Sequence, residues 1–186
     1  GEDECDFTLT AYCSTGNFFD LGEVRVYFNG SYVSDYETFT SSGGSVPSTV
    51  GWRTFLWEWS VTQVSGQTLG SPIDVATTRH GFYTILTEPS SFYCSSFGET
   101  GVPWTDVLDW GCNWASGETS YSACMSKLTQ GLYGYSGLKY TPDDSEYSAG
   151  DVLYLQELLD EIDSQSSTMV NCVVYANLLD VLAYSI

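Results

Sequence analysis

The residue whose type and position best suit covalent chemistry is Cys172. A polar run from Ser164 to Thr168 precedes Asn171 and Cys172, and apolar residues then continue to Ile186. The side-chain oxygen of Asn171 can accept hydrogen bonds from the free amides of a first helical turn, so we expect a helix that begins at Cys172. The positive end of a helix dipole favours a thiolate over a thiol. Cys172 therefore lies where a catalytic cysteine would be placed.

The chemistry expected of such a thiol is acyl transfer, in which its sulfur attacks an amide carbonyl and forms a thioester. The backbone amide of Cys172 would be an oxyanion donor, because the first turn of a helix offers it no carbonyl partner. A base is also required, and the only histidine is His80, in the other half of the chain. We expect His80 to be a surface or strand-edge residue. The alternative for Cys172 is a buried or disulfide-bonded cysteine that packs the helix.

The amino-acid sequence of this region suggests a family. Residues 171–186 read NCVVYANLLDVLAYSI, with a cysteine followed by Tyr-Ala and leucine-rich turns; residues 104–117 read WTDVLDWGCNWASG and residues 121–140 read YSACMSKLTQGLYGYSGLKY. These segments resemble the core helix, the two leading helices and the tyrosine-bearing link of transglutaminase-like (papain-like) domains of bacterial secreted proteins. The resemblance implies Cys172 as the nucleophile and a protein or peptide as the substrate.

In that family, a histidine and an aspartate or asparagine on later strands activate the nucleophile. This chain stops within the expected nucleophile helix, with no glycine or asparagine cap and no basic last turn before Ile186. We therefore expect residues 104–186 to be an incomplete, nucleophile-bearing half. Its partner would be the remainder of the same polypeptide or further extracellular copies.

Composition limits the classes of partner. The 186 residues include 24 acidic side chains and only five lysines and arginines, for a formal net charge of −19. No basic patch can be assembled, so we expect no binding to nucleic acid or to anionic lipid surfaces. The hydrophobic content of 42% argues against a disordered acidic tail. No transmembrane run and no signal peptide are present, and we expect a processed protein that is secreted or held at the cell surface.

Six cysteines favour an oxidising compartment. Four of them are candidates for structural disulfides that close a small loop and staple two helices: Cys5 with Cys13, and Cys112 with Cys124. Cys94 and Cys172 are left over, so Cys94 needs a partner outside the chain if Cys172 is a free nucleophile. The spacings contain no CxxC and there is a single histidine, so we expect no metal site and no cofactor.

Residues 1–89 have the period of β-strands and predict an antiparallel β-sandwich-like domain. Asn29-Gly30 is a strong hairpin signal, and we favour a turn there over glycosylation at the Asn-Gly-Ser pattern. Residues 67–72 are expected to form another turn, and residues 81–87 a further strand. Four apolar residues alternate with polar ones on the strand before that turn: Phe55, Trp57, Trp59 and Val61. We expect these aromatic residues to form a core, with a carbohydrate-binding row as the alternative.

Residues 90–103 are rich in Ser, Pro and Gly and are expected to be a linker. Beyond it the period is helical, which makes the fold class α+β. Helices are expected from about residue 104, from 120 to 133, from 148 or 151, and from 172. Four acidic residues precede or begin the third helix without EF-hand spacing, so a solvated loop is favoured over a calcium site: Asp143, Asp144, Glu146 and Asp151.

Three interpretations follow from the sequence. The first is a secreted transglutaminase-like or cysteine-protease-like enzyme that carries its nucleophile at Cys172. The second is an extracellular structural or adhesive protein that keeps the fold without the chemistry. The third is a carbohydrate-binding β module with a helical appendage.

Overall fold

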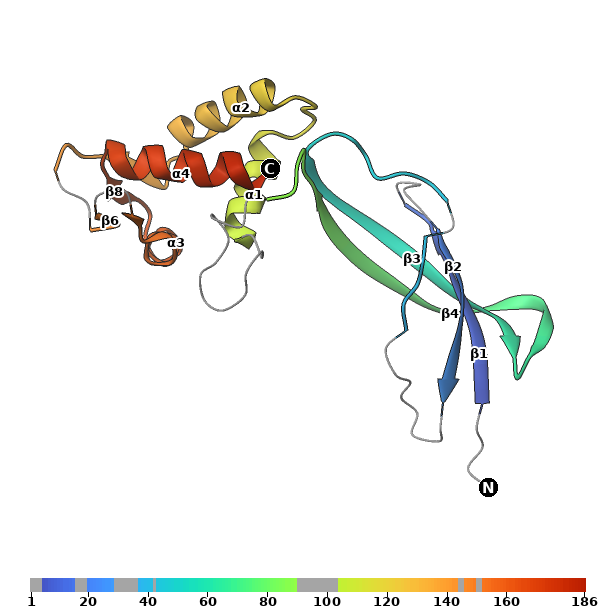
Figure 1. Cartoon of the computed structure of the whole chain (residues 1–186). Helices are drawn as coiled ribbons and strands as arrows, with labels where there is room; N and C mark the ends of the chain where they lie inside the picture. Colours follow the sequence, from blue (N-terminus) through green and yellow to red (C-terminus); the bar gives the residue numbers. More distant parts are fainter. Residues whose placement is uncertain are drawn as a thin grey trace. The chain divides into compact units, whose positions relative to one another are not determined.

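The protein is described from a computed structural model, and the described residues are 5–15, 20–28, 37–41, 43–89, 104–143, 146–149 and 152–186. A four-stranded antiparallel sheet in the N-terminal half is followed by helices (Figure 1), so the predicted α+β class is confirmed. The chain divides into a sheet unit, Gly1–Pro47 with Arg53–Phe82, and a helical unit, Ser48–Trp52 with Tyr83–Ile186. The predicted Asn29-Gly30 turn and the predicted linker at 90–103 lie outside the described residues.

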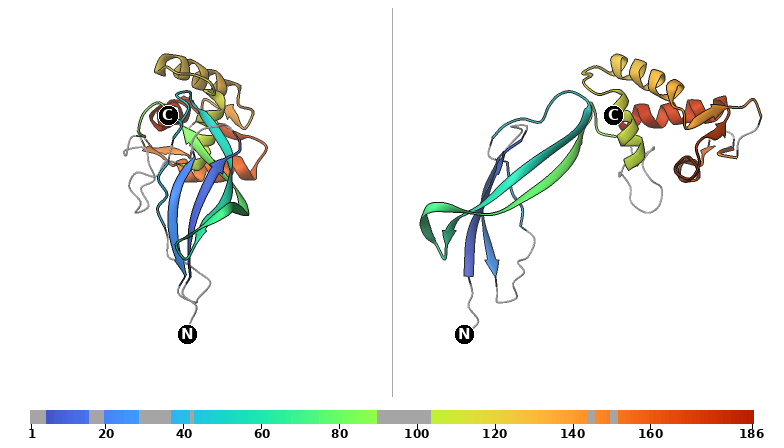
Figure 2. Two further views of the ribbon diagram at one scale, coloured as in Figure 1. Left: turned by 90° about the vertical axis from the view of Figure 1, so that its right-hand side faces the viewer. Right: turned by 180° about the vertical axis from the view of Figure 1, so that it is seen from behind.

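The sheet has the strand order β2-β1-β3-β4, which leaves β2 and β4 at its edges. Its strands are β1 (Cys5–Cys13), β2 (Leu21–Phe28), β3 (Gly51–Val64) and β4 (Gln67–Thr84). The described part of the N-terminal half holds this one sheet rather than two sheets packed as a sandwich. Figure 2 shows that β3 and β4 form a long, twisted ribbon that extends beyond the other two strands.

The turn between β3 and β4 lies earlier in the chain than the sequence suggested. Ser65 and Gly66 connect the strands with positive φ angles of 49° and 75°, which is the backbone of a type I′ hairpin turn. The expected turn at residues 67–72 is wrong, because those residues belong to β4. Pro72 is tolerated there because β4 is an edge strand, where a missing backbone N–H costs no inner hydrogen bond.

The two faces of the sheet differ in polarity, as the alternation in β3 predicts. Trp57 and Trp59 lie opposite Cys13 and Ala11 of β1, and both β1 residues are buried. The other face is polar and includes the pair of Tyr12 with Glu58. An ion pair between Asp6 and Arg25 lies on β1 and β2.

The described residues of the helical unit form four helices and two small two-stranded sheets. Its helices are α1 (Thr105–Trp114), α2 (Tyr121–Gly134), α3 (Leu155–Ser164) and α4 (Cys172–Ser185). β5 (Leu138–Tyr140) pairs in parallel with β8 (Thr168–Val170), and β6 (Ser148–Ala149) pairs antiparallel with β7 (Val152–Leu153). The third helix starts later than expected, because residues 148–149 and 152–153 form the paired strands β6 and β7 instead of a first helical turn.

Helix α4 packs on α1, α2 and β7, and its buried residues are apolar except for Ser185. The core of the unit includes five side chains with less than 2% exposure: Leu128, Leu158, Leu178, Leu182 and Ile186. The carbonyl of Ile186 accepts hydrogen bonds from the amides of Leu86 (2.6 Å) and Thr87 (3.2 Å). Both ends of α4 are therefore fixed by backbone contacts, the first by β8 and the last by the segment after β4.

Candidate functional site

The N-terminus of α4 is capped as the sequence predicts. The Oδ1 atom of Asn171 accepts hydrogen bonds from the amides of Val173 and Val174, both at 3.1 Å. The carbonyl of Asn171 accepts from the amide of Tyr175 at 3.2 Å. The amide of Cys172 has no hydrogen-bond partner among the described residues. It is thus the first-turn donor that a bound oxyanion could use.

Exposure separates Cys172 from the other cysteines whose side chains the structure describes. Cys172 is exposed, whereas Cys13, Cys112 and Cys124 are buried. The thiol of Cys13 donates to the carbonyl of Thr15 at 2.9 Å. Burial, and secondarily the negative charge of Glu118, raises the pKa of the Cys124 thiol. Among these four thiols, only that of Cys172 is accessible to a substrate.

The predicted disulfides are not formed in this structure. Cys5 and Cys13 are the first and last residues of the same strand, about 26 Å apart along its axis. A disulfide requires Cα atoms within about 7 Å, so the predicted pairing of these two residues is wrong. Cys112 and Cys124 are both thiols, and the sulfur of Cys112 is directed at the carbonyl of Thr84, 3.8 Å away. Cys94 lies outside the described residues.

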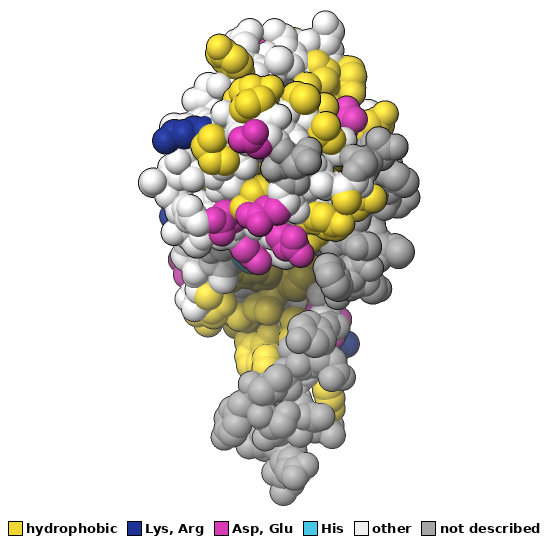
Figure 3. Space-filling view, turned by 90° about the vertical axis from the view of Figure 1, so that its left-hand side faces the viewer, with side chains coloured by type: hydrophobic (Ala, Val, Ile, Leu, Met, Phe, Trp, Pro, Cys, Tyr) yellow, Lys and Arg dark blue, Asp and Glu magenta, His cyan; other side chains and the backbone are white. Residues whose placement is uncertain are grey.

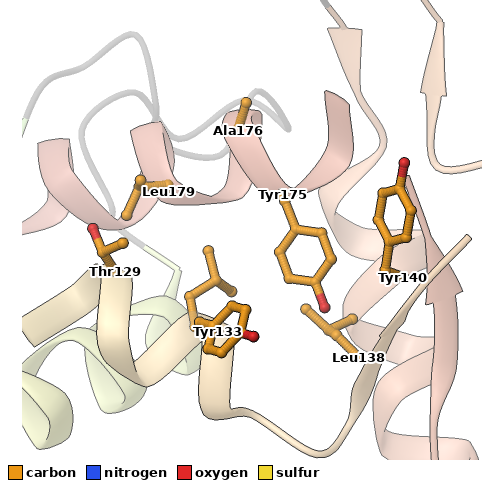
Figure 4. Close-up of a pocket in the computed structure, with 8 residues that line it drawn as sticks. Thr129, Tyr133, Leu138, Tyr140, Tyr175, Ala176 and Leu179 are labelled. Atoms are coloured by element: carbon orange, nitrogen blue, oxygen red, sulfur yellow. The ribbon is translucent and has the colours of Figure 1, made fainter. Parts of the chain in front are cut away.

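A pocket of about 610 Å³ lies between α2 and α4 (Figure 4). Its lining is aliphatic and aromatic, with hydroxyl groups as the polar atoms: Thr129, Leu132, Tyr133, Leu138, Tyr140, Tyr175, Ala176 and Leu179. In Figure 4 the ring of Tyr175 extends from α4 into this space toward Leu138. Burial raises the pKa of the Tyr175 hydroxyl, which keeps it neutral. This composition and volume are typical of a site for a small organic group.

The pocket continues the helical stripe on which Cys172 lies. Tyr175, Ala176 and Leu179 follow Cys172 at three, four and seven positions, a spacing that places all four on one side of α4. With 1.5 Å of rise per residue, the first two lie about 4.5 and 6 Å along the axis from Cys172. Tyr140 pairs in register with Val170, directly before the cap of α4. The pocket and the thiol are therefore neighbours.

His80 lies in the sheet unit, exposed on edge strand β4, as predicted from the sequence. Its ring stacks on Phe55 with centroids 5.5 Å apart and contacts Trp57 at 4.7 Å. Its Nε2 atom is 2.8 Å from Oγ1 of Thr78, and the same oxygen accepts from Nε1 of Trp59 at 2.7 Å. His80 thus belongs to an aromatic and hydroxyl network of the sheet.

The aromatic residues of β3 pack against one another. Trp57 contacts Phe55 and Trp59 at centroid distances of 4.7 and 5.8 Å, and Phe39 contacts Trp59 at 5.2 Å. Phe55 is buried, and Trp57 and Trp59 are half-buried. Such mutual packing is that of a hydrophobic face rather than of an exposed row that stacks on sugar rings.

The acidic residues singled out from the sequence form no metal centre in the described part of the chain. Asp144 and Asp151 lie outside it, and the described residues contain no group of three or more His, Cys, Asp or Glu side chains suited to a metal ion. Asp143 accepts a hydrogen bond from Thr141 at 3.3 Å. Figure 3 shows a group of acidic side chains beside separate hydrophobic patches on one face of the molecule.

Comparisons with protein-family models, with curated proteins and with solved structures found no match to this chain. In the described residues, no helix combines the length and the hydrophobicity needed to cross a membrane. Sequence reasoning identified Cys172 and its cap but missed the pocket. The tyrosine-rich segment 133–140 was the available signal, since three of its tyrosines and leucines line the pocket together with α4.

Proposed function

We propose that the helical unit carries a thiol acyl-transfer site, transglutaminase-like or cysteine-peptidase-like, with Cys172 as the nucleophile and a peptide as the substrate. The observation that carries the proposal is an exposed thiol at the first residue of a capped helix that packs one side into the core, next to an apolar pocket. The resemblance of residues 171–186 to the nucleophile helix of the family supports it independently. We propose that this acidic protein acts after secretion or at the cell surface.

In the proposed step, Sγ of Cys172 bonds to the carbonyl carbon of an amide, and the carbonyl oxygen becomes an oxyanion. The amide of Cys172 donates to that oxyanion. When the carbon–nitrogen bond breaks, the amine leaves with a proton and a thioester is formed, which water or a second amine then resolves. The thiol proton must reach the leaving amine through a base. The helical unit contains no histidine, so this base would come from another polypeptide segment or from solvent.

An activated ester tests the nucleophile alone, because its leaving group does not need to be protonated as a leaving amine does. With p-nitrophenyl acetate, we expect one equivalent of p-nitrophenolate to be released and one acetyl group to be found on Cys172 by peptide mass mapping. The Cys172→Ser variant should lose the rapid release, and Cys13→Ser should keep it, because Cys13 is buried in the sheet unit. No acetyl group on Cys172 of the folded protein would refute the proposal and favour a non-catalytic structural protein.

A further inference from the structure

The pocket between α2 and α4 lets the proposed function be made more specific. We propose that this pocket is a subsite for an uncharged aromatic or branched aliphatic side chain of the peptide whose carbonyl Cys172 attacks. The inference rests on the proposed function, because it assigns the pocket to the same substrate.

Position supports the assignment. Three lining residues of α4 share the side of the helix on which Cys172 lies, within about two turns of it. Tyr140 lies at the end of the pocket nearest the start of α4 (Figure 4). A group bound in the pocket therefore needs only a short linker to place a carbonyl beside the thiol.

Charge selects the class of occupant. None of the eight lining residues is an aspartate, glutamate, lysine, arginine or histidine, and their polar side-chain groups are tyrosine and threonine hydroxyls. An ionic side chain would lose hydration there without gaining a charged partner. The net charge of −19 further repels acidic peptides. An apolar side chain meets neither penalty.

The tyrosine hydroxyls support a peptide rather than a purely apolar occupant. The hydroxyls of Tyr133, Tyr140 and Tyr175 are, with that of Thr129, the polar side-chain groups of the lining. Tyr133 and Tyr140 line the pocket and are 91% and 60% exposed, so both side chains can be reached by a ligand from solvent. Such groups can bond to backbone amides of a peptide whose side chain is held between the rings.

Alkylation of Cys172 by reagents that differ only in the group beyond the reactive carbon tests the subsite. The reagents are chloroacetamide, N-benzylchloroacetamide and chloroacetylglycine, which is anionic. In each case sulfur bonds to carbon, chloride leaves and the thiol proton passes to buffer. Rates on Cys172 are measured by peptide mass mapping and divided by the rates with glutathione. We expect the benzyl reagent to exceed chloroacetamide about tenfold, with saturation, and chloroacetylglycine to be slowest.

Variants of α4 supply the control. Ala176→Trp places an indole in the pocket from an exposed position and should reduce the benzyl preference to about one. Val173→Trp, also exposed on α4 but outside the pocket lining, should keep the preference. Circular dichroism checks that both variants are folded.

The outcomes separate the two proposals. Labelling of Cys172 by chloroacetamide without a benzyl preference, or a preference that Ala176→Trp leaves intact, overturns the subsite and leaves the nucleophile. No labelling of Cys172 by any reagent in the folded protein refutes the nucleophile and the subsite with it. A preference lost only in Ala176→Trp supports both.

Discussion

The helical unit and the sheet unit bury their hydrophobic residues in different ways. A connected core of buried residues lies within the helical unit, where fully buried leucines from α2, α3 and α4 meet. In the sheet unit, aromatic rings on β3 and β4 contact one another over one face, and several stay half-buried. The first arrangement holds one side of a helix against a core, whereas the second packs aromatic rings over a single sheet.

The difference bears on where a reactive group can be held in place. A nucleophile requires fixed neighbours on one side and open space on the other. α4 satisfies this requirement, because one side of it packs into the core and its first residue is exposed. In the sheet unit, the side chain with the most suitable chemistry, His80, is engaged in ring contacts and in a hydrogen bond to Thr78.

The largest effect is expected in the core of the helical unit. Leu178→Ala removes a fully buried side chain from α4 and should lower the free energy of unfolding by about 2–5 kcal/mol. Urea denaturation followed by helical circular dichroism measures the change. Val173→Ala, at an exposed position of the same helix, is the matched control and should change stability by less than about 0.5 kcal/mol. Equal effects at the two positions would contradict the assigned core.

A methyl group added between α1 and α2 tests how tightly this unit is packed. A Cβ atom at Gly131 would overlap the ring of Trp114, which Trp110 and Tyr135 hold from other sides. We expect Gly131→Ala to destabilise by about 1–2 kcal/mol, because overpacking outweighs the better helix propensity of alanine. Gly134→Ala, with open space around its Cβ position, is the control. A melting temperature for Gly131→Ala at or above that of the control would show that the ring moves aside freely.

The cap of α4 links stability to the proposed chemistry. Asn171→Ala deletes the acceptor for the amides of Val173 and Val174 and should cost about 1 kcal/mol. Because the first turn then frays, the rate of Cys172 alkylation should also change. Asn171→Asp keeps an acceptor and should retain most of the stability. A melting temperature unaffected by Asn171→Ala would mean that the cap adds nothing to the helix.

The smallest effect is expected in the sheet unit. Trp59→Phe keeps a ring in the aromatic face but removes the donor to Thr78, at a cost of about 0.5–1 kcal/mol. Thermal unfolding followed by tryptophan fluorescence, with Trp52→Phe as an exposed control, measures it. A loss above that of Leu178→Ala would reverse the comparison between the two units.

Local signals were sufficient for most helices. Ser120 and Asn171 are caps whose side chains accept from first-turn amides, so the starts of α2 and α4 could be predicted within a residue. Segments whose residues suggest one secondary structure but form another were predicted less well. Gly70 and Pro72 resemble a turn but lie on an edge strand, and Ser148 resembles a helix start but belongs to the short strand β6.

In the candidate site, the reactive residue can be identified from its neighbours in the sequence, whereas its surroundings come from distant segments of the chain. Cys172 and Asn171 are adjacent in sequence, and their chemistry follows from the helix that they begin. The pocket combines Thr129 and Tyr133 of α2 with Leu138 of β5, and no local periodicity announces that these elements meet α4. The Cys5–Cys13 pairing failed for a related reason, because the residues between them form one extended strand rather than a loop.

The parallel pairing of β5 with β8 has a kinetic consequence. The strands β6 and β7 and the helix α3 lie between β5 and β8 along the chain. β5 and β8 can therefore pair only after this intervening segment has folded back. Contacts between distant parts of a chain form slowly compared with a helix. The thiol that follows β8 should therefore acquire its fixed surroundings late in folding. During refolding, the rate at which the Cys172 thiol is labelled would report when the helical unit has finished folding.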